Sequence, residues 1–199
     1  MSTLSRRTKI ITVFIAIILV GSATAWFSNR NTNLPKSFVQ AREQGALIAQ
    51  NIVDLSDQST NDLATVNSLD KSGNYAQALA LTTNIITKNQ DLHGQALSLS
   101  RQIQTMAEAL PNITSLPARQ SALDAISSRL ALVSELITYS NDLNSLLVAL
   151  QGHFTGTGIK PGEVTAIVNQ INTDVNAINN FNNQAQQAMT TFDALEAKR

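Results

Sequence analysis

The chain has 199 residues, no cysteine, a formal net charge of zero and only 14% charged residues. The lack of cysteine excludes disulfides, thiolate metal sites and a cysteine nucleophile. After residue 25 the chain holds 11 basic and 14 acidic residues. This mildly acidic remainder lacks the basic clusters that nucleic-acid binding requires, so no nucleic-acid partner is expected.

The first predicted element is the uncharged apolar stretch Ile10–Phe27, which follows a short basic segment. As a helix it would span roughly 27 Å, just enough for the hydrocarbon core of a bilayer. Basic flanks remain in the cytoplasm, and aromatic residues favour the opposite interface. Residues 1–27 therefore predict a single-pass signal anchor that contacts membrane lipid and holds the body outside the cytoplasm. The anchor residues are Arg6, Arg7, Lys9, Ile10, Phe14, Ile18, Trp26 and Phe27.

The same stretch also fits a cleaved signal peptide. Gly21 can end the apolar helix, and Ala23 and Ala25 form a small-x-small cleavage site. Cleavage after residue 25 would release a periplasmic or secreted protein, whereas the anchor would keep the protein at the cell membrane. Both interpretations place the body outside the cytoplasm.

Four long helices are predicted after a linker at residues 28–34, over about residues 35–70, 75–110, 117–151 and 161–198. Each has apolar residues every three or four positions, the spacing of a helix that packs on others. Gly73 suits the end of the first helix, and Asn74 suits the N-cap of the second. Helices of similar length with two short connections and one longer loop predict an all-α, elongated, antiparallel up-down-up-down bundle over residues 35–199. The alternative fold is a pair of helical hairpins that complete their cores by dimerising.

The third helix carries two overlapping apolar stripes, a breadth typical of the most buried helix or of one that also meets a partner. The first stripe comprises Leu123, Ile126, Leu130, Val133 and Ile137. The second gives a candidate interaction face, namely Leu132, Leu136, Tyr139 and Leu143. In the second helix, Asn89 interrupts an apolar stripe; a polar core residue often fixes helix register, and a ligand contact is the alternative.

The sequence offers no recognisable constellation for catalysis, cofactor binding or metal binding. The chain has two histidines, His93 and His153, and neither follows the Glu-x-x-His spacing of di-iron bundles. No Gly-x-Ser-x-Gly motif or calcium-loop motif is present. We therefore expect a protein that is not an enzyme and has no cofactor.

Two functions remain open. The first is a membrane-tethered bundle with a structural or protein-interaction role in the cell envelope, with a protein partner or a second copy of the chain. The second is an extracytoplasmic ligand-sensing bundle that acts through a separate signalling partner, an expectation based on the predicted fold alone.

Overall fold

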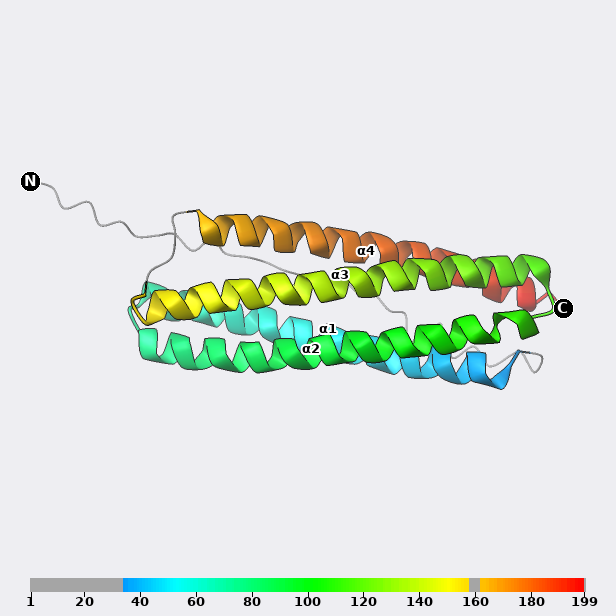
Figure 1. The fold of residues 1–199 in the computed structure, drawn as a ribbon, viewed down its shortest axis with the longest axis horizontal. Helices are drawn as coiled ribbons and strands as arrows, with labels where there is room; N and C mark the ends of the chain where they lie inside the picture. The colour runs from blue at the N-terminus through cyan, green and yellow to red at the C-terminus, as the bar shows by residue number, and fades with distance from the viewer. Residues whose placement is uncertain (1–33, 158–161, 199) are drawn as a thin grey trace, which may run out of the picture.

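The computed structural model describes residues 34–157 and 162–198, and this part of the chain is all-helical (Figure 1). Its four long helices are α1 (Lys36–Lys71), α2 (Tyr75–Ala109), α3 (Leu116–Phe154) and α4 (Glu163–Glu196). A short 3₁₀ helix, η2 (Leu110–Asn112), joins α2 to α3. The prediction of an all-α helical bundle is confirmed.

The four helices lie along the long axis of the molecule, and each runs opposite to the one before it (Figure 1). Helices that follow each other in sequence pack together most closely, whereas α1 and α4 approach each other less closely. Long side chains bridge α1 and α4 near one end, where the rings of Phe38 and Phe192 have centroids 5.4 Å apart. At 1.5 Å per residue, each helix is roughly 50 to 60 Å long.

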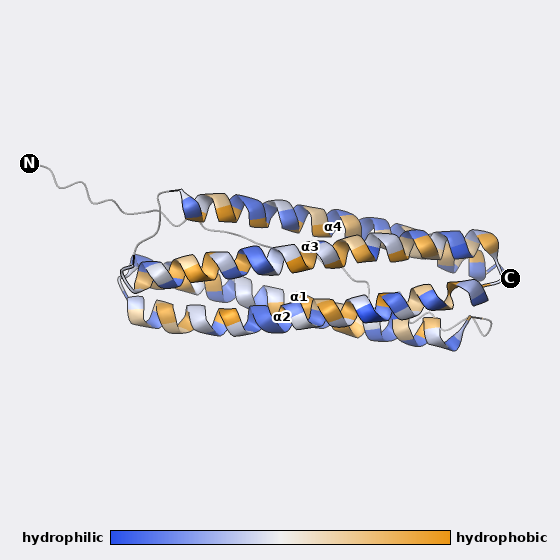
Figure 2. Ribbon diagram, in the orientation of Figure 1, coloured by the Kyte–Doolittle hydropathy of each residue, from blue (hydrophilic) through white to orange (hydrophobic). Residues whose placement is uncertain are grey.

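One continuous hydrophobic core runs through the bundle and takes side chains from all four helices. Hydrophobic residues recur along every helix (Figure 2), as the three-to-four spacing requires. In α2 the buried side chains recur every three or four residues from Ala78 to Ala109, whereas Tyr75, at the start of the helix, is 48% exposed. In the described residues, this core is built from side chains of all four helices of the one chain.

The turn between α1 and α2 is set by Gly73, whose φ of +76° lies in the left-handed region that favours glycine. Its amide donates to the Asp70 carbonyl at 3.0 Å, and the Asn74 amide donates to the Leu69 carbonyl at 2.9 Å. These bonds satisfy carbonyls that the end of α1 would otherwise leave unpaired. Asn74 is the N-cap residue of α2, but its side chain donates to the Ser72 hydroxyl at 3.0 Å and makes no capping bond.

The predicted membrane anchor, residues 1–27, lies outside the described residues, as does most of the linker. Among the helices within residues 34–157 and 162–198, none combines the length and the apolarity that crossing a bilayer requires. The anchor therefore stays a prediction from the sequence.

Candidate functional site

A layer of buried polar side chains interrupts the hydrophobic core, and every helix contributes to it. Ser56 and Tyr139 lie just past the middle of α1 and α3, whereas Asn89 and Asp174 lie just before the middle of α2 and α4. Because consecutive helices run in opposite directions, these positions fall at a similar level of the bundle. We call these four residues and the adjacent Ser140 the polar layer; each is at most 3% exposed.

Asn89 connects α2 to α3 within the polar layer. Its side-chain amide donates to the Ser140 carbonyl at 2.7 Å, and the Ser140 hydroxyl donates to the Asn89 carbonyl at 3.4 Å. This reciprocal pair holds the two helices at one relative height, since a shift along the axis would break both bonds. The contact supports the interpretation of Asn89 as a register residue. The Asn89 Oδ1 atom has no hydrogen-bond partner within the described protein.

Tyr139 brings a phenol hydroxyl into the same layer, close to Ser56 of α1 and Asp174 of α4. Burial raises the pKa of Tyr139 to about 12; the nearby Ser56 hydroxyl opposes the shift and the charge of Asp174 adds to it. The Ser56 hydroxyl is 0% exposed and completes no hydrogen bond of good geometry within the described residues. The Tyr139 hydroxyl therefore stays protonated across the physiological range.

Asp174 is the ionisable carboxyl of the polar layer and is only 2% exposed. Burial raises the pKa of Asp174 to about 6, the Gln170 hydrogen bond lowers it, and the neighbouring Asp142 and Glu135 raise it. The Gln170 amide donates to Asp174 Oδ1 at 2.9 Å, whereas Oδ2 has no partner of good geometry in the described structure. Asp174 therefore binds a proton in mildly acidic conditions, where an ordinary aspartate is ionised.

A second polar cluster lies closer to the end of the bundle where α1 begins and α4 ends. It links α1, α3 and α4. Arg42 donates to both carboxylate oxygens of Asp193, at 2.6 and 2.7 Å. Arg129 of α3 is 9% exposed and lies near both residues. Burial and the charge of Arg42 lower the pKa of Arg129 to about 9, and Asp193 opposes this shift. Arg129 therefore remains charged at neutral pH, and the cluster has the character of a structural ion network.

The polar layer and this cluster contain residues that the sequence patterns did not single out. Asp174 stands three residues after Ile171 and four before Ile178, so it shares their face of α4. Arg129 stands in the same relation to Ile126 and Val133 on α3. An ionisable residue at a position of an apolar stripe could have revealed both residues. It was overlooked because neighbouring apolar residues completed each stripe without them.

Of the two histidines, His153 has a partner in the fold. Its Nε2 atom lies 2.9 Å from Asp70 Oδ1. This contact joins the last turn of α3 to the end of α1. The ring packs edge-on to Tyr75 with centroids 6.1 Å apart, and Phe154 stacks on Tyr75 at 6.2 Å. His93 is half-buried on α2. Across residues 34–157 and 162–198, no three His, Cys, Asp or Glu side chains are placed to hold a metal ion.

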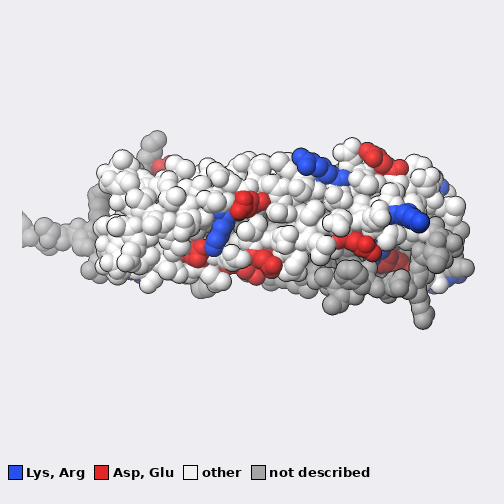
Figure 3. Space-filling view, turned by 90° about the horizontal axis from the view of Figure 1, so that it is seen from below, with Lys and Arg blue, Asp and Glu red and all other residues white. Residues whose placement is uncertain are grey.

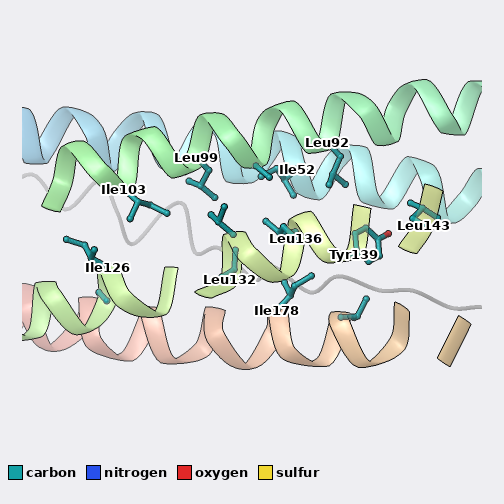
Figure 4. Close-up of a cluster of buried hydrophobic side chains, with 14 of the residues drawn as sticks. Ile52, Leu92, Leu99, Ile103, Ile126, Leu132, Leu136, Tyr139, Leu143 and Ile178 are labelled. Carbon is teal, nitrogen blue, oxygen red and sulfur yellow. The ribbon is translucent and has the colours of Figure 1, made fainter. Parts of the chain in front are cut away.

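The candidate interaction face predicted on α3 is part of the core. Its four side chains point into the space between the helices, beside Leu92 and Leu99 of α2 and Ile178 of α4 (Figure 4). The face comprises Leu132, Leu136, Tyr139 and Leu143, and its members are between 0% and 4% exposed. The burial corrects the prediction: α3 packs on both α2 and α4, which covers this stripe within the chain.

Residues of the other apolar stripe lie partly on the surface. Leu123 is 43% exposed and Leu130 is 46% exposed, whereas Ile126 and Val133 of the same stripe are buried. The preceding Leu116, at the start of α3, is 71% exposed. The outer side of α3 therefore carries leucines that the bundle does not cover.

The residues assigned to the membrane anchor and to the cleavage site, Ala23 and Ala25, lie outside the described part of the chain. Comparison of the chain with protein-family models, curated proteins and solved structures gave no significant match.

Proposed function

We propose that the chain is a membrane-tethered, extracytoplasmic helical bundle with a structural or protein-interaction role in the cell envelope. The observation that carries this proposal is the uncharged stretch Ile10–Phe27 behind three basic residues with no preceding acid. That arrangement directs the following chain across a membrane and holds it there, by the positive-inside rule. In the cleaved form, the same bundle is periplasmic or secreted.

The elongated shape of the bundle suits a protein that presents surfaces at a distance from the membrane. Its four antiparallel helices make a rod roughly 50 to 60 Å long. Charged side chains are sparse on the face that Figure 3 shows. The exposed residues of α4 between Thr165 and Ala194 are all uncharged, and most are Asn, Gln or Thr. These surfaces favour contacts through hydrogen bonds and apolar side chains. We propose a non-catalytic role, because the sequence offers no recognisable constellation of catalytic residues.

Cysteine labelling tests the proposed orientation, because the chain has no cysteine of its own. Asn176→Cys places a thiol on the exposed face of α4, and Ser5→Cys places one before the apolar stretch. A membrane-impermeant maleimide should label Asn176→Cys in intact cells and Ser5→Cys only after permeabilisation. Protection of Asn176→Cys in intact cells would contradict the proposal. Intact mass distinguishes the full-length, tethered form from a form that starts at Trp26.

A ligand-sensing role is the second candidate, and the polar layer is the observation that favours it. Asn89 Oδ1 is buried without a hydrogen-bond partner in the described structure. A small polar molecule or a proton that reached this layer would change the stability of the bundle, and a separate partner would have to transmit the signal. A thermal-shift screen of polar metabolites tests this role through mass action. A uniform absence of stabilisation would count against it.

A further inference from the structure

The charged residues of the bundle are unevenly divided between its two ends. Figure 1 places the start of α1, the α2–α3 connection and the end of α4 at one end of the rod. If each helix is divided at its middle, the half at that end holds six basic and six acidic described residues. The opposite half comprises residues 54–71, 75–92, 136–157 and 162–179, and it holds two basic and eight acidic residues. The excess of negative charge therefore lies in the half remote from the start of α1.

Three basic residues lie at the end of the rod where α1 starts. Lys36 is the first residue of α1, Arg119 lies in the first turn of α3, and Lys198 stands two residues after α4. Lys36 and Lys198 are exposed, and Arg119 is half-buried. Arg119 donates from Nε and Nη2 to the Ile113 carbonyl at 3.1 and 2.8 Å. Because that carbonyl is neutral, these bonds hold the guanidinium in place and leave its positive charge. We call these three residues and the helix termini that carry them the basic end.

The acidic residues at the same level offset the basic end only in part. Glu108, near the end of α2, is exposed. Asp193 is bound by Arg42 at 2.6 and 2.7 Å, and Glu196 is only 4% exposed. The next exposed charges are Glu43, Arg101 and Asp124. They lie about 10 to 12 Å behind the end, where salt screens most of their effect on a surface that touches it. The outer surface of the basic end therefore presents three basic side chains and one acidic side chain.

The proposed membrane anchor is close to the basic end along the chain. Lys36 stands nine residues after Phe27, so even a fully extended connection spans no more than about 32 Å. The rod is longer than this connection, at roughly 50 to 60 Å. The basic end is therefore held within reach of the membrane surface in every orientation. The opposite half reaches that surface only when the rod lies flat along it.

A membrane surface with anionic headgroups distinguishes these two orientations. With the rod upright, the basic end meets the headgroups, and Lys and Arg side chains are attracted to them. With the rod flat, the acidic half is brought to the same surface, and like charges repel. Since the connection to the anchor already keeps the basic end near the membrane, a small number of basic residues is enough to hold the contact.

We propose that the basic end is a docking surface for anionic lipid headgroups, on which the tethered bundle stands upright. The inference rests on the proposed membrane tether, for which it names the contacting surface and the class of lipid. In this orientation the acidic half points away from the membrane, and the sides of the four helices stay clear of the lipid.

Fluorescence quenching by lipid tests the contact with the full chain reconstituted in vesicles. The vesicles contain phosphatidylcholine alone or mixed with phosphatidylglycerol, and both kinds carry some lipid with a spin label on its headgroup. Thr114→Cys places a fluorescent label at the exposed connection beside the basic end, and Gln77→Cys places the same label at the opposite end. In the anionic vesicles the spin label should quench the first label several-fold more than the second, because only the basic end is held at the headgroups.

Charge variants of the Thr114→Cys chain test which residues hold the contact. Lys36→Gln together with Lys198→Gln should lower the ratio of contacting to free chains roughly fivefold or more, since each lysine near an anionic surface contributes about that factor. Lys71→Gln, at an exposed position of the opposite end, is the matched control and should leave the quenching unchanged. High salt should also release the contact of the chain that keeps all its lysines, and this measurement needs no charge substitution.

Four outcomes would overturn the inference. They are equal quenching at the two ends, equal quenching in neutral and anionic vesicles, insensitivity to salt, and unchanged quenching in the folded double lysine variant. Retention of the chain by the vesicles through an alkaline wash tests the tether separately. A retained chain that shows no contact overturns the docking surface alone. A chain that the wash removes contradicts the tether, and the inference with it.

Discussion

The two sides of α3 are similar in composition and opposite in environment. The inner side holds Leu136 and Leu143, which are 0% exposed, and the outer side holds Leu123 and Leu130, which are 43% and 46% exposed. Both sets recur at helical spacing, so hydrophobic periodicity does not distinguish them. The difference lies in the neighbours: α2 and α4 cover the inner side. A broad apolar helix can therefore combine a core face with an exposed apolar face.

The largest expected effect comes from truncating a leucine on the inner side. Leu143→Ala should lower the free energy of unfolding by about 2 to 5 kcal/mol, because it opens a cavity in a packed core. Leu130→Ala removes the same atoms from a half-exposed site and should cost about 1 kcal/mol or less. Urea titration followed by far-ultraviolet circular dichroism measures both values. Equal losses in the two variants would show that the inner and outer sides do not differ as described.

The sequence predicted the helices better than their rotation about their own axes. Helix ends depend on nearby residues, such as Gly73 at the end of α1 and Pro117 at the start of α3, so α2 and α3 begin close to where the patterns place them. Which side of α3 faces inward depends on α2 and α4, which are distant in sequence. The same limit explains why the inner stripe was predicted as an interaction face.

The polar layer shows the same distinction between local and non-local information. Asn89 stood out because it interrupted an otherwise regular apolar stripe. Asp174 did not, since the adjacent Val175 satisfied the stripe of α4. That Ser56, Tyr139 and Asp174 meet at one level follows only from the way in which three helices align. Spacing within a single helix contains no information about that alignment.

The next largest effect concerns the charge that Asp174 carries in the polar layer once it is ionised. Folding raises the pKa of Asp174 from 3.8 to about 6. Between these values the folded chain holds a proton that the unfolded chain has released, so the free energy of unfolding falls as the pH rises through this window. The loss levels off about one pH unit above the folded-state pKa and is on the order of 1 to 3 kcal/mol, because Asp142 shares in the titration.

Asp174→Asn removes the titrating group and retains an oxygen that can accept the bond from Gln170. The variant should match the unsubstituted chain near pH 4 and exceed its stability near pH 8 by on the order of 1 to 3 kcal/mol. Urea midpoints measured across this pH range give the difference. The same substitution at the exposed Asp57 is the control and should leave the pH profile as it was. A constant difference at every pH would show that Asp174 does not titrate in this window.

A smaller effect is expected from the bond that aligns the inner side of α3 with α2. Asn89→Ala removes the amide that donates to the Ser140 carbonyl at 2.7 Å. Loss of this buried bond should lower the free energy of unfolding by about 1 to 2 kcal/mol. Asn84→Ala, at an exposed position of α2, is the matched control and should change it by less than about 0.5 kcal/mol. Equal effects of the two substitutions would contradict the interpretation of Asn89 as a register residue.

The smallest expected effects belong to the exposed leucines on the outer side of α3, and they complete the comparison. Glutamine retains the helix propensity of leucine, so Leu116→Gln and Leu123→Gln report mainly on lost burial. Leu116 is the more exposed, so its substitution should change the free energy of unfolding by less than about 0.5 kcal/mol, with a slightly larger change at Leu123. Urea titration at low protein concentration measures the monomer. If both substitutions cost as much as Leu143→Ala, the outer side of α3 belongs to the core of the monomer. If they cost little, the core lies on the inner side of α3 alone.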